Sequence, residues 1–215
     1  MRQHIFVPVM SLDRSRGEVI DLAFTPDPAR RSRFGRDTLA GSLTRLGLRH
    51  VGRAALAAAI ALDDGAAAAS VDLAGRLGVG LAGNGFQFGL ALGLLLCRPP
   101  WRPSATVIAT GSFAVPAEDG RLAAANGEDL AARLAIVGDG LRRQAIPGPA
   151  VVFCPAGLDD GGATADALAG IIADLRQAGA EVWPVTGLAE AIDHLGQDHA
   201  APGARTKGEE PWLMR

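Results

Sequence analysis

The stretch 105–134, "ATVIATGSFAVPAEDGRLAAANGEDLAARL", contains three successive local patterns that together indicate a mixed α/β fold. Its first part, residues 105–115, is apolar and rich in Val, Ile and Thr, which predicts a buried strand. The polar centre predicts a hairpin, with Asp119 and Gly120 in the turn. Asn126 is a residue type that favours a helix N-cap, and the helix predicted after it runs through residues 128–143.

The same kinds of pattern continue on both sides of this stretch and predict an α/β domain with a mixed sheet. Two short strands at 4–12 and 17–26 are expected to pair, and extended chain is expected at 70–81. Further strands are predicted at 150–157 and 181–187, and helices at 38–47, 52–65, 86–97, 166–179 and 188–196. We expect a single domain over residues 1–196 and a flexible C-terminal tail over 197–215, where the chain is polar and contains Pro and Gly.

The charge balance limits the partners that the chain can have. The formal net charge is −2, which argues against a general nucleic-acid-binding role. Lys207 is the only lysine among the 21 basic residues, and it lies in the predicted tail. Because arginine stays protonated at working pH, Lys207 is the one residue that a mechanism using a neutral lysine could employ.

The length of the apolar runs and the spacing of the cysteines indicate the cellular compartment that we expect for this protein. No uncharged apolar run reaches the length of a membrane span, and the N-terminus has no signal-peptide pattern, so we expect a cytoplasmic protein without membrane contact. Cys97 and Cys154 are far apart in sequence and have no metal-ligand spacing. We interpret them as buried thiols and expect neither a metal site nor a cofactor.

The stretch "GNGFQFG" at 83–89 has two interpretations. Glycines followed by a helix can cradle a phosphate, although the acidic residue that a dinucleotide site needs about 20 positions later is missing. The alternative is close helix packing, because Gly85, Gly89 and Gly93 recur at a spacing that places them on one helix face. Gln87 is the only polar side chain of this apolar helix, and we expect it to satisfy backbone groups near the helix start.

Arginines offer partners for an anionic ligand if the first interpretation holds. Arg98 and Arg102 follow the apolar helix, and four more arginines fall within 29–36. We favour a solvated loop for the run 29–36, since short charge runs usually face water. A small anion or nucleotide held by Gly83, Gly85, Arg98 and Arg102 stays open as an alternative function.

The chain resembles the proteolytic domain of Lon proteases, most clearly in the motifs from residue 107 onward. The resemblance is carried by "VIATGSFAVPAEDGRLAAANGEDLAARL", then "VVFCPA", then "GAEVWPVTGLAEAI". A similar pattern occurs in the Lon-like domain of the bacterial recombination ATPase RadA. The resemblance covers about residues 71–195, whereas residues 1–70 match only in the order of elements, and it implies a ribosomal protein S5 domain 2-like fold.

Lon-type hydrolysis, as the resemblance implies, uses a serine nucleophile and a neutral lysine that takes its proton. When the family's pattern is counted back without gaps from Thr110, its serine falls at Gly85. When the two glycines of the family's nucleophile loop are aligned with Gly85 and Gly89, the serine falls at Gln87. The segment between Ser70 and Ser104 contains no serine or threonine. The nucleophile position is therefore degenerate in either alignment.

The lysine position is degenerate as well. Counting forward from Arg121 places it at Asp129, or at Glu128 with one gap. Both carboxylates also suit the first turn of a helix, where they complement its dipole. A third residue, the glutamate that follows Thr-Gly in many Lon enzymes, is Ser112 here.

These replacements predict a catalytically inactive, Lon-protease-like domain without the serine–lysine dyad. It would act as an oligomerisation, scaffold or partner-binding module, because Lon-type domains are commonly fused to AAA+ ATPases and assemble as rings. An AAA+ ATPase or copies of itself would be the partner. An enzyme that uses Glu118, Glu128 or Asp129 for acid–base chemistry, or Cys97 or Cys154 as nucleophile, is a further alternative.

Overall fold

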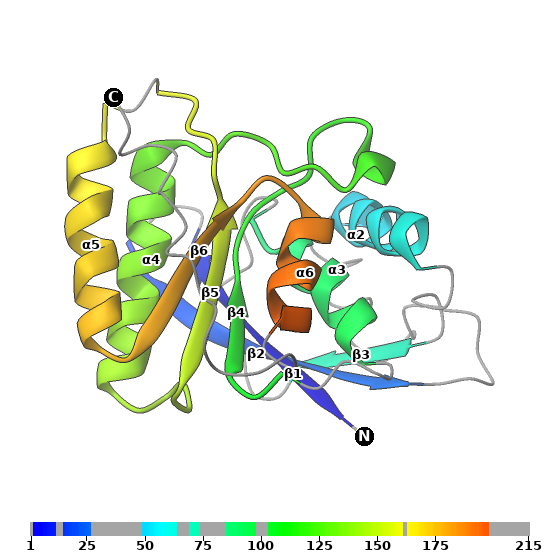
Figure 1. Cartoon of the computed structure of the whole chain (residues 1–215), viewed down its shortest axis with the longest axis horizontal. Helices are drawn as coiled ribbons and strands as arrows, with labels where there is room; N and C mark the ends of the chain where they lie inside the picture. Colours follow the sequence, from blue (N-terminus) through cyan, green and yellow to red (C-terminus); the bar gives the residue numbers. More distant parts are fainter. Residues whose placement is uncertain are drawn as a thin grey trace.

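A computed structural model describes residues 2–11, 15–26, 49–63, 69–73, 85–97, 103–160 and 163–197. It confirms the α/β class: one six-stranded mixed sheet has helices on both faces (Figure 1). The strands are β1 (Gln3–Met10), β2 (Gly17–Pro26), β3 (Ala69–Leu73), β4 (Thr106–Ala109), β5 (Ala150–Pro155) and β6 (Ala180–Val185). The helices are α2 (Arg49–Leu62), α3 (Gln87–Leu96), α4 (Gly127–Arg142), α5 (Ala165–Gln177) and α6 (Leu188–Gln197), with a 3-10 helix η2 (Ala117–Asp119).

The sheet has an antiparallel half and a parallel half that meet at β1. Its strand order is β3-β2-β1-β4-β5-β6. As predicted, β1 and β2 pair antiparallel, with Val7 opposite Ile20, and β3 continues this half. On the other side β1, β4, β5 and β6 run parallel. Pro184 is compatible with β6 because β6 is the edge strand, where a missing N–H is tolerated.

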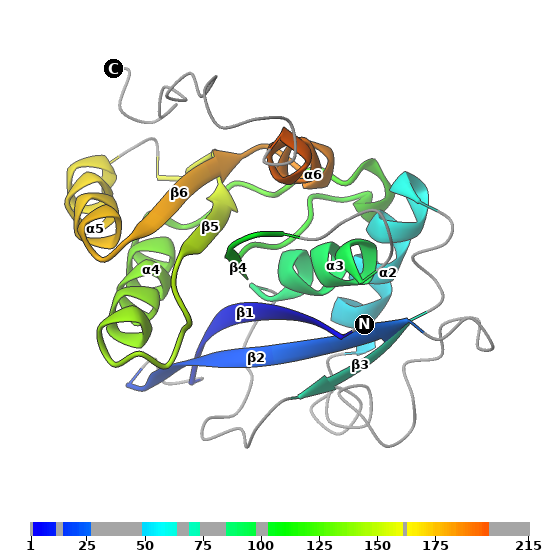
Figure 2. The same cartoon turned by 60° about the horizontal axis from the view of Figure 1, so that its bottom comes forward.

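Each face of the sheet packs against its own helices (Figure 2). Along β1 the side chains alternate, so Ile5, Val7 and Val9 join the core that contains α3 and parts of α2 and α6. Phe6 faces the opposite way and packs into the second core, which α4 and α5 cover. The sheet therefore separates two hydrophobic cores.

Helix α3 is enclosed by protein, as its apolar sequence predicts. All of its residues are buried. A Cβ atom at Gly89 would lie 2.6 Å from Cγ2 of Val7, and one at Gly93 would overlap the ring of Phe24. The glycine spacing therefore serves close packing of α3 on β1 and β2, in agreement with the packing interpretation.

The hairpin after β4 forms as predicted, but the strand that leads into it is shorter. Residues 105–115 were expected to form one strand, whereas β4 ends at Ala109. The chain leaves the sheet at Gly111, whose φ of 145° suits glycine. Hydrogen bonds of 2.9 Å from Ala114 N–H to Arg121 O and from Ala123 N–H to Ser112 O then close the hairpin.

Some predicted features lie outside the described residues. These are the helix at 38–47, the basic run 29–36 and the tail beyond 197. Cys97 and Cys154 are buried free thiols, as expected. Within the described ranges, no helix is long and apolar enough to cross a membrane, and no cluster of three metal-ligating side chains occurs.

Asn126 caps α4, as predicted. Its backbone is extended and its Oδ1 accepts a hydrogen bond of 3.1 Å from Asp129 N–H. Glu128 and Asp129 fall in the first turn, where their charges complement the helix dipole.

Asn126→Ala should lower the free energy of unfolding by about 1 kcal/mol, because one N–H at the start of α4 loses its acceptor. Urea unfolding measured by circular dichroism gives this value. Asn126→Asp is the matched control, since aspartate keeps the acceptor oxygen and should remain near the wild type. Equal losses in both variants would show that the side-chain acceptor does not hold this helix start.

Candidate functional site

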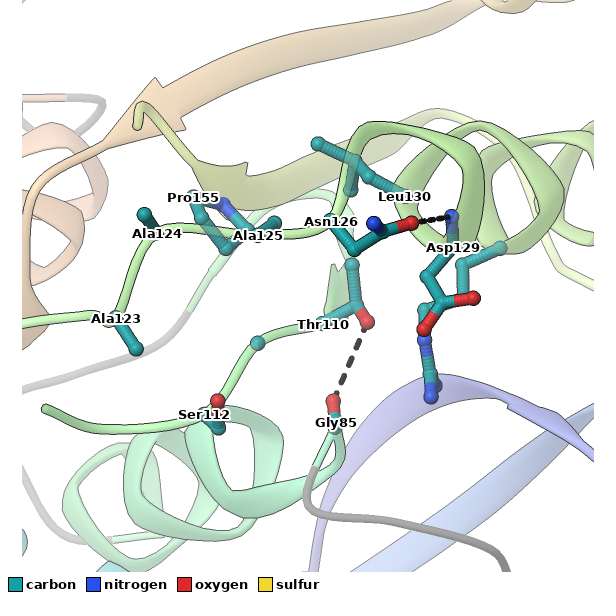
Figure 3. Close-up of a pocket in the computed structure, with 12 residues that line it drawn as sticks. Gly85, Thr110, Ser112, Ala123, Ala124, Ala125, Asn126, Asp129, Leu130 and Pro155 are labelled. Atoms are coloured by element: carbon teal, nitrogen blue, oxygen red, sulfur yellow. Dashed lines mark hydrogen bonds between the residues drawn. The ribbon is translucent and has the colours of Figure 1, made fainter. Parts of the chain in front are cut away.

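The candidate site lies where the chain changes from one face of the sheet to the other. Helix α3 precedes β4 and covers one face, whereas α4 follows β4 and covers the opposite face. Ligand sites of open α/β sheets form at such switch points, beyond the carboxyl ends of the strands. A cavity of about 200 Å³ is found at this position, at the end of β4 (Figure 3). It is lined by Gly85, Thr110, Gly111, Ser112, Ala123, Ala124, Ala125, Asn126, Asp129, Leu130, Arg133 and Pro155.

Hydrogen bonds fix the start of α3 against the end of β4. The carbonyl oxygen of Gly85 accepts from Gly111 N–H at 2.8 Å and from the hydroxyl of Thr110 at 3.2 Å (Figure 3). In return, Phe88 N–H donates to Gly111 O at 3.1 Å. Thr110 is only 1% exposed. The cavity therefore has one wall whose backbone position is set by three hydrogen bonds.

The structure brings together one of the two residues that the resemblance aligns with the serine and one of the two that it aligns with the lysine. Gly85, in the turn before α3, and Asp129, in the first turn of α4, both line the cavity. Figure 3 shows the Asp129 side chain extending from α4 on the side of Thr110 and Gly85. Glu128 is exposed and Gln87 is buried, and neither lines this cavity.

Gln87 bonds a backbone group, as predicted, but that group belongs to the hairpin after β4. We expected it to bond backbone groups near the start of its own helix. Its Oε1 instead accepts a hydrogen bond of 3.0 Å from the N–H of Phe113, in the hairpin. Gln87 is 5% exposed, and Phe113 is buried against Phe88 in an edge-to-face contact, so this N–H needs a protein acceptor.

Arg133 is a site residue that the sequence analysis missed. It lies one helical turn after Asp129 on α4 and also lines the cavity. Its Nη1 donates a hydrogen bond of 2.9 Å to the carbonyl oxygen of Pro8 in β1. The spacing of four between Asp129 and Arg133 was the available signal, because residues four apart share a helix face.

The guanidinium of Arg133 occupies the space that a side chain at position 85 would need. A Cβ atom on Gly85 would lie 2.5 Å from Cζ and 2.6 and 2.7 Å from the two terminal nitrogens of Arg133. These similar distances mean that the Cβ would press on the face of the guanidinium. The absence of a side chain at position 85 therefore leaves the space that the Arg133 guanidinium occupies.

The charges in the cavity balance. Asp129 supplies one negative charge and Arg133 one positive charge, and these are the only ionisable groups among the lining residues described. Thr110, Ser112 and Asn126 add neutral polar groups, and the three lining alanines, 123–125, add none. The cavity thus offers hydrogen-bonding groups and two opposite charges.

The other candidate residues do not join this site. Gly83, Arg98 and Arg102 lie outside the described residues, so Gly85 is the one described member of that ligand-binding set. Glu118 is exposed in η2. Cys97 and Cys154 are buried and do not line the cavity.

No model of a known protein family matches this chain, and no curated protein matches it. The function proposed below therefore rests on the resemblance noted in the sequence and on the cavity at the end of β4.

Proposed function

We propose that this chain is a catalytically inactive domain with a Lon-protease-like, ribosomal protein S5 domain 2-like fold, acting as a partner-binding or assembly module. Two findings support the proposal. The order of strands and helices from β3 onward follows the motifs on which the resemblance rests. Gly85 and Asp129, which the resemblance aligns with the nucleophile and the base, line one cavity, as a former catalytic pair would.

The pairing of Gly85 with Arg133 carries the proposal. A serine at position 85 would need its Cβ where the guanidinium now lies, 2.5 Å from Cζ. At the position of the base, Asp129 has a carboxylate, whose proton affinity is far too low to replace a neutral lysine as the base for a serine hydroxyl. In this proposal the Arg133 guanidinium fills the space that the side chain of a nucleophile at position 85 would take.

Hydrolysis of an unstructured protein substrate is the direct test of inactivity. The full chain should release no peptides above the level of a buffer control, because Gly85 and Asp129 supply neither the serine nor the lysine of the dyad. Fluorescence from a dye-labelled casein substrate measures the rate. Asp129→Ala is the matched variant, and turnover in the wild type that disappears in this variant would overturn the proposal.

The assembly role follows from the resemblance, which implies an AAA+ ATPase or further copies of this chain as the partner. Light scattering on the purified chain distinguishes the two. A mass several times the 22.1 kDa of one chain would support self-assembly. A monomer would direct the search to a different protein as the partner.

Ligand binding without catalysis is the second candidate function. The observation that favours it is the cavity itself, which keeps polar and charged groups although the nucleophile is gone. Gly85, which the alternative interpretation of the 83–89 stretch includes among the ligand-binding residues, is one of the lining residues.

A further inference from the structure

We propose that the outer edge of β6 pairs with β6 of a second copy of this chain, antiparallel and across a two-fold axis at Val182. The inference rests on the proposed function, in which the domain assembles, and it names the partner and the surface. The outward backbone groups of β6 and the small exposed side chains of α5 support it.

Strand β6 directs one row of backbone groups away from the described sheet. It is the last strand in the order and pairs with β5 alone among the described strands. In a parallel pair, alternate residues direct their N–H and C=O groups to the neighbouring strand. Val185 O accepts a hydrogen bond of 3.0 Å from Ala156 N–H, so the odd-numbered residues of β6 face β5 with their backbone groups. The backbone groups of Ala180, Val182 and Pro184 therefore face away from β5.

The outward groups of this edge complement themselves. In antiparallel pairing, two residues directly opposite each other exchange both hydrogen bonds. With the two-fold axis at Val182, the two copies of Val182 form such a pair, and Ala180 N–H of each copy meets Pro184 O of the other. Every outward donor then has an acceptor. A register centred on Pro184 would instead place two prolines opposite each other and lose both central bonds.

The outer edge ends at Pro184. Thr186 is the next residue that points the same way, and its backbone groups already have partners. Its O accepts a hydrogen bond of 2.8 Å from Leu122 N–H, and its N–H donates to Oε2 of Glu190 at 2.7 Å. The pairing segment is therefore 180–184, and side chains beside it must supply the rest of the interface.

Trp183 supplies an apolar surface on one side of the pairing segment. It is half-buried, and its indole stacks on His194 of α6 with ring centroids 4.3 Å apart. Trp183 directly follows the central Val182, in a non-hydrogen-bonded position, where side chains of paired strands come closest. The second strand would therefore run past the indole and cover it.

Helix α5 permits close approach on the other side. It packs on β6 and lies at the same edge of the molecule (Figure 2). Its exposed residues include Ala167, Gly170 and Ala173, and at Gly170 no described atom lies within 4 Å of an added Cβ. Because these side chains are short, α5 of a second copy can pack against this helix.

Sedimentation equilibrium of the full chain over a range of concentrations tests the proposal. At high concentration the mass should be that of two 22.1 kDa chains, and it should fall on dilution. Val182→Pro removes the central outward N–H of each copy but no bond to β5, so it should weaken the dimer roughly tenfold or more. Pro184→Val adds an outward N–H opposite Ala180 O and should strengthen the dimer.

A pair of surface variants makes the test independent of changes within the strand. Gly170→Arg places a long charged side chain in open space on α5, so the fold should persist while the dimer weakens. Ala61→Arg makes the same change of charge at an exposed position of α2, far from α5 (Figure 1), and should assemble as the wild type does. Far-ultraviolet circular dichroism verifies that the variants are folded.

Three results would overturn the inference: the chain is a monomer at every concentration, folded Val182→Pro assembles as well as the wild type, or Ala61→Arg loses as much affinity as Gly170→Arg. Failure here is distinct from failure of the proposed function. An inactive chain that assembles independently of β6, or with a different protein only, refutes this surface alone. A chain that hydrolyses protein through Asp129 refutes the inactive-domain proposal itself.

Discussion

Gly93→Ala should lower the free energy of unfolding by about 2 kcal/mol. A methyl group at this position would overlap the ring of Phe24, which is 0% exposed and therefore has no open space to move into. Overpacking costs about 1–3 kcal/mol, and the upper end applies here because the added Cβ would lie within 2.6 Å of three ring atoms of Phe24. The better helix propensity of alanine offsets about 1 kcal/mol, which leaves a net loss of about 2 kcal/mol. The clash dominates because α3 is buried along its whole length.

Gly170→Ala in α5 is the matched control. It is the same substitution inside another helix, but no atom lies within 4 Å of the added Cβ. It should therefore stabilise the protein by about 0.5–1 kcal/mol, the usual gain when alanine replaces glycine in a helix. Urea unfolding of both variants should shift in opposite directions. A Gly93→Ala variant as stable as Gly170→Ala would mean that α3 does not pack on β2 at this point.

Local features of the fold could be predicted because they depend on near neighbours in the chain. The cap of α4 is an example, since Asn126 and Asp129 are three residues apart. The apolar, glycine-spaced sequence of α3 likewise predicted a helix surrounded by protein. The residues that it meets, Val7 and Phe24, come from distant strands, and nothing local to α3 identifies them.

The end of β4 shows where local patterns fail. The apolar residues from Phe113 to Val115 resemble a continuation of the strand, and they were assigned to it. Phe113 instead leaves the sheet and packs edge to face on Phe88, with ring centroids 6.3 Å apart. Burial of Phe113 in the core gives the same apolar pattern as a strand, and Val115, which is 97% exposed, adds to that pattern without being buried. Periodicity alone therefore did not distinguish this segment from a strand.

Two members of the candidate site could be predicted from the sequence, but its geometry could not. Counting along the sequence left two positions for each residue of the dyad that the resemblance implies, and the fold brings Gly85 and Asp129 to one cavity. Gln87 does not line the cavity, because its side chain is bonded to Phe113 in the hairpin. Arg133 escaped notice because its contacts with Gly85 and Pro8 join three separate parts of the chain.

Gly85→Ser should also lower the free energy of unfolding by about 2 kcal/mol, through a mechanism that differs from the one at Gly93. The new Cβ would displace the Arg133 guanidinium and break its hydrogen bond to Pro8 O. A hydrogen bond from a charged donor contributes about 1.5–3 kcal/mol. Arg133→Ala, which removes the same hydrogen bond by truncation, should cause a loss of similar size.

The double variant Gly85→Ser/Arg133→Ala tests whether the two residues act as a pair. Without the guanidinium the serine has room, so the double variant should be less destabilised than the sum of the single variants, by about 1–3 kcal/mol. Urea unfolding of all four proteins completes the cycle. Additive losses would show that Arg133 does not occupy the space of a side chain at position 85. A large coupling would show that the two side chains compete for one space, so that a serine at position 85 is accommodated only when the guanidinium moves or is removed.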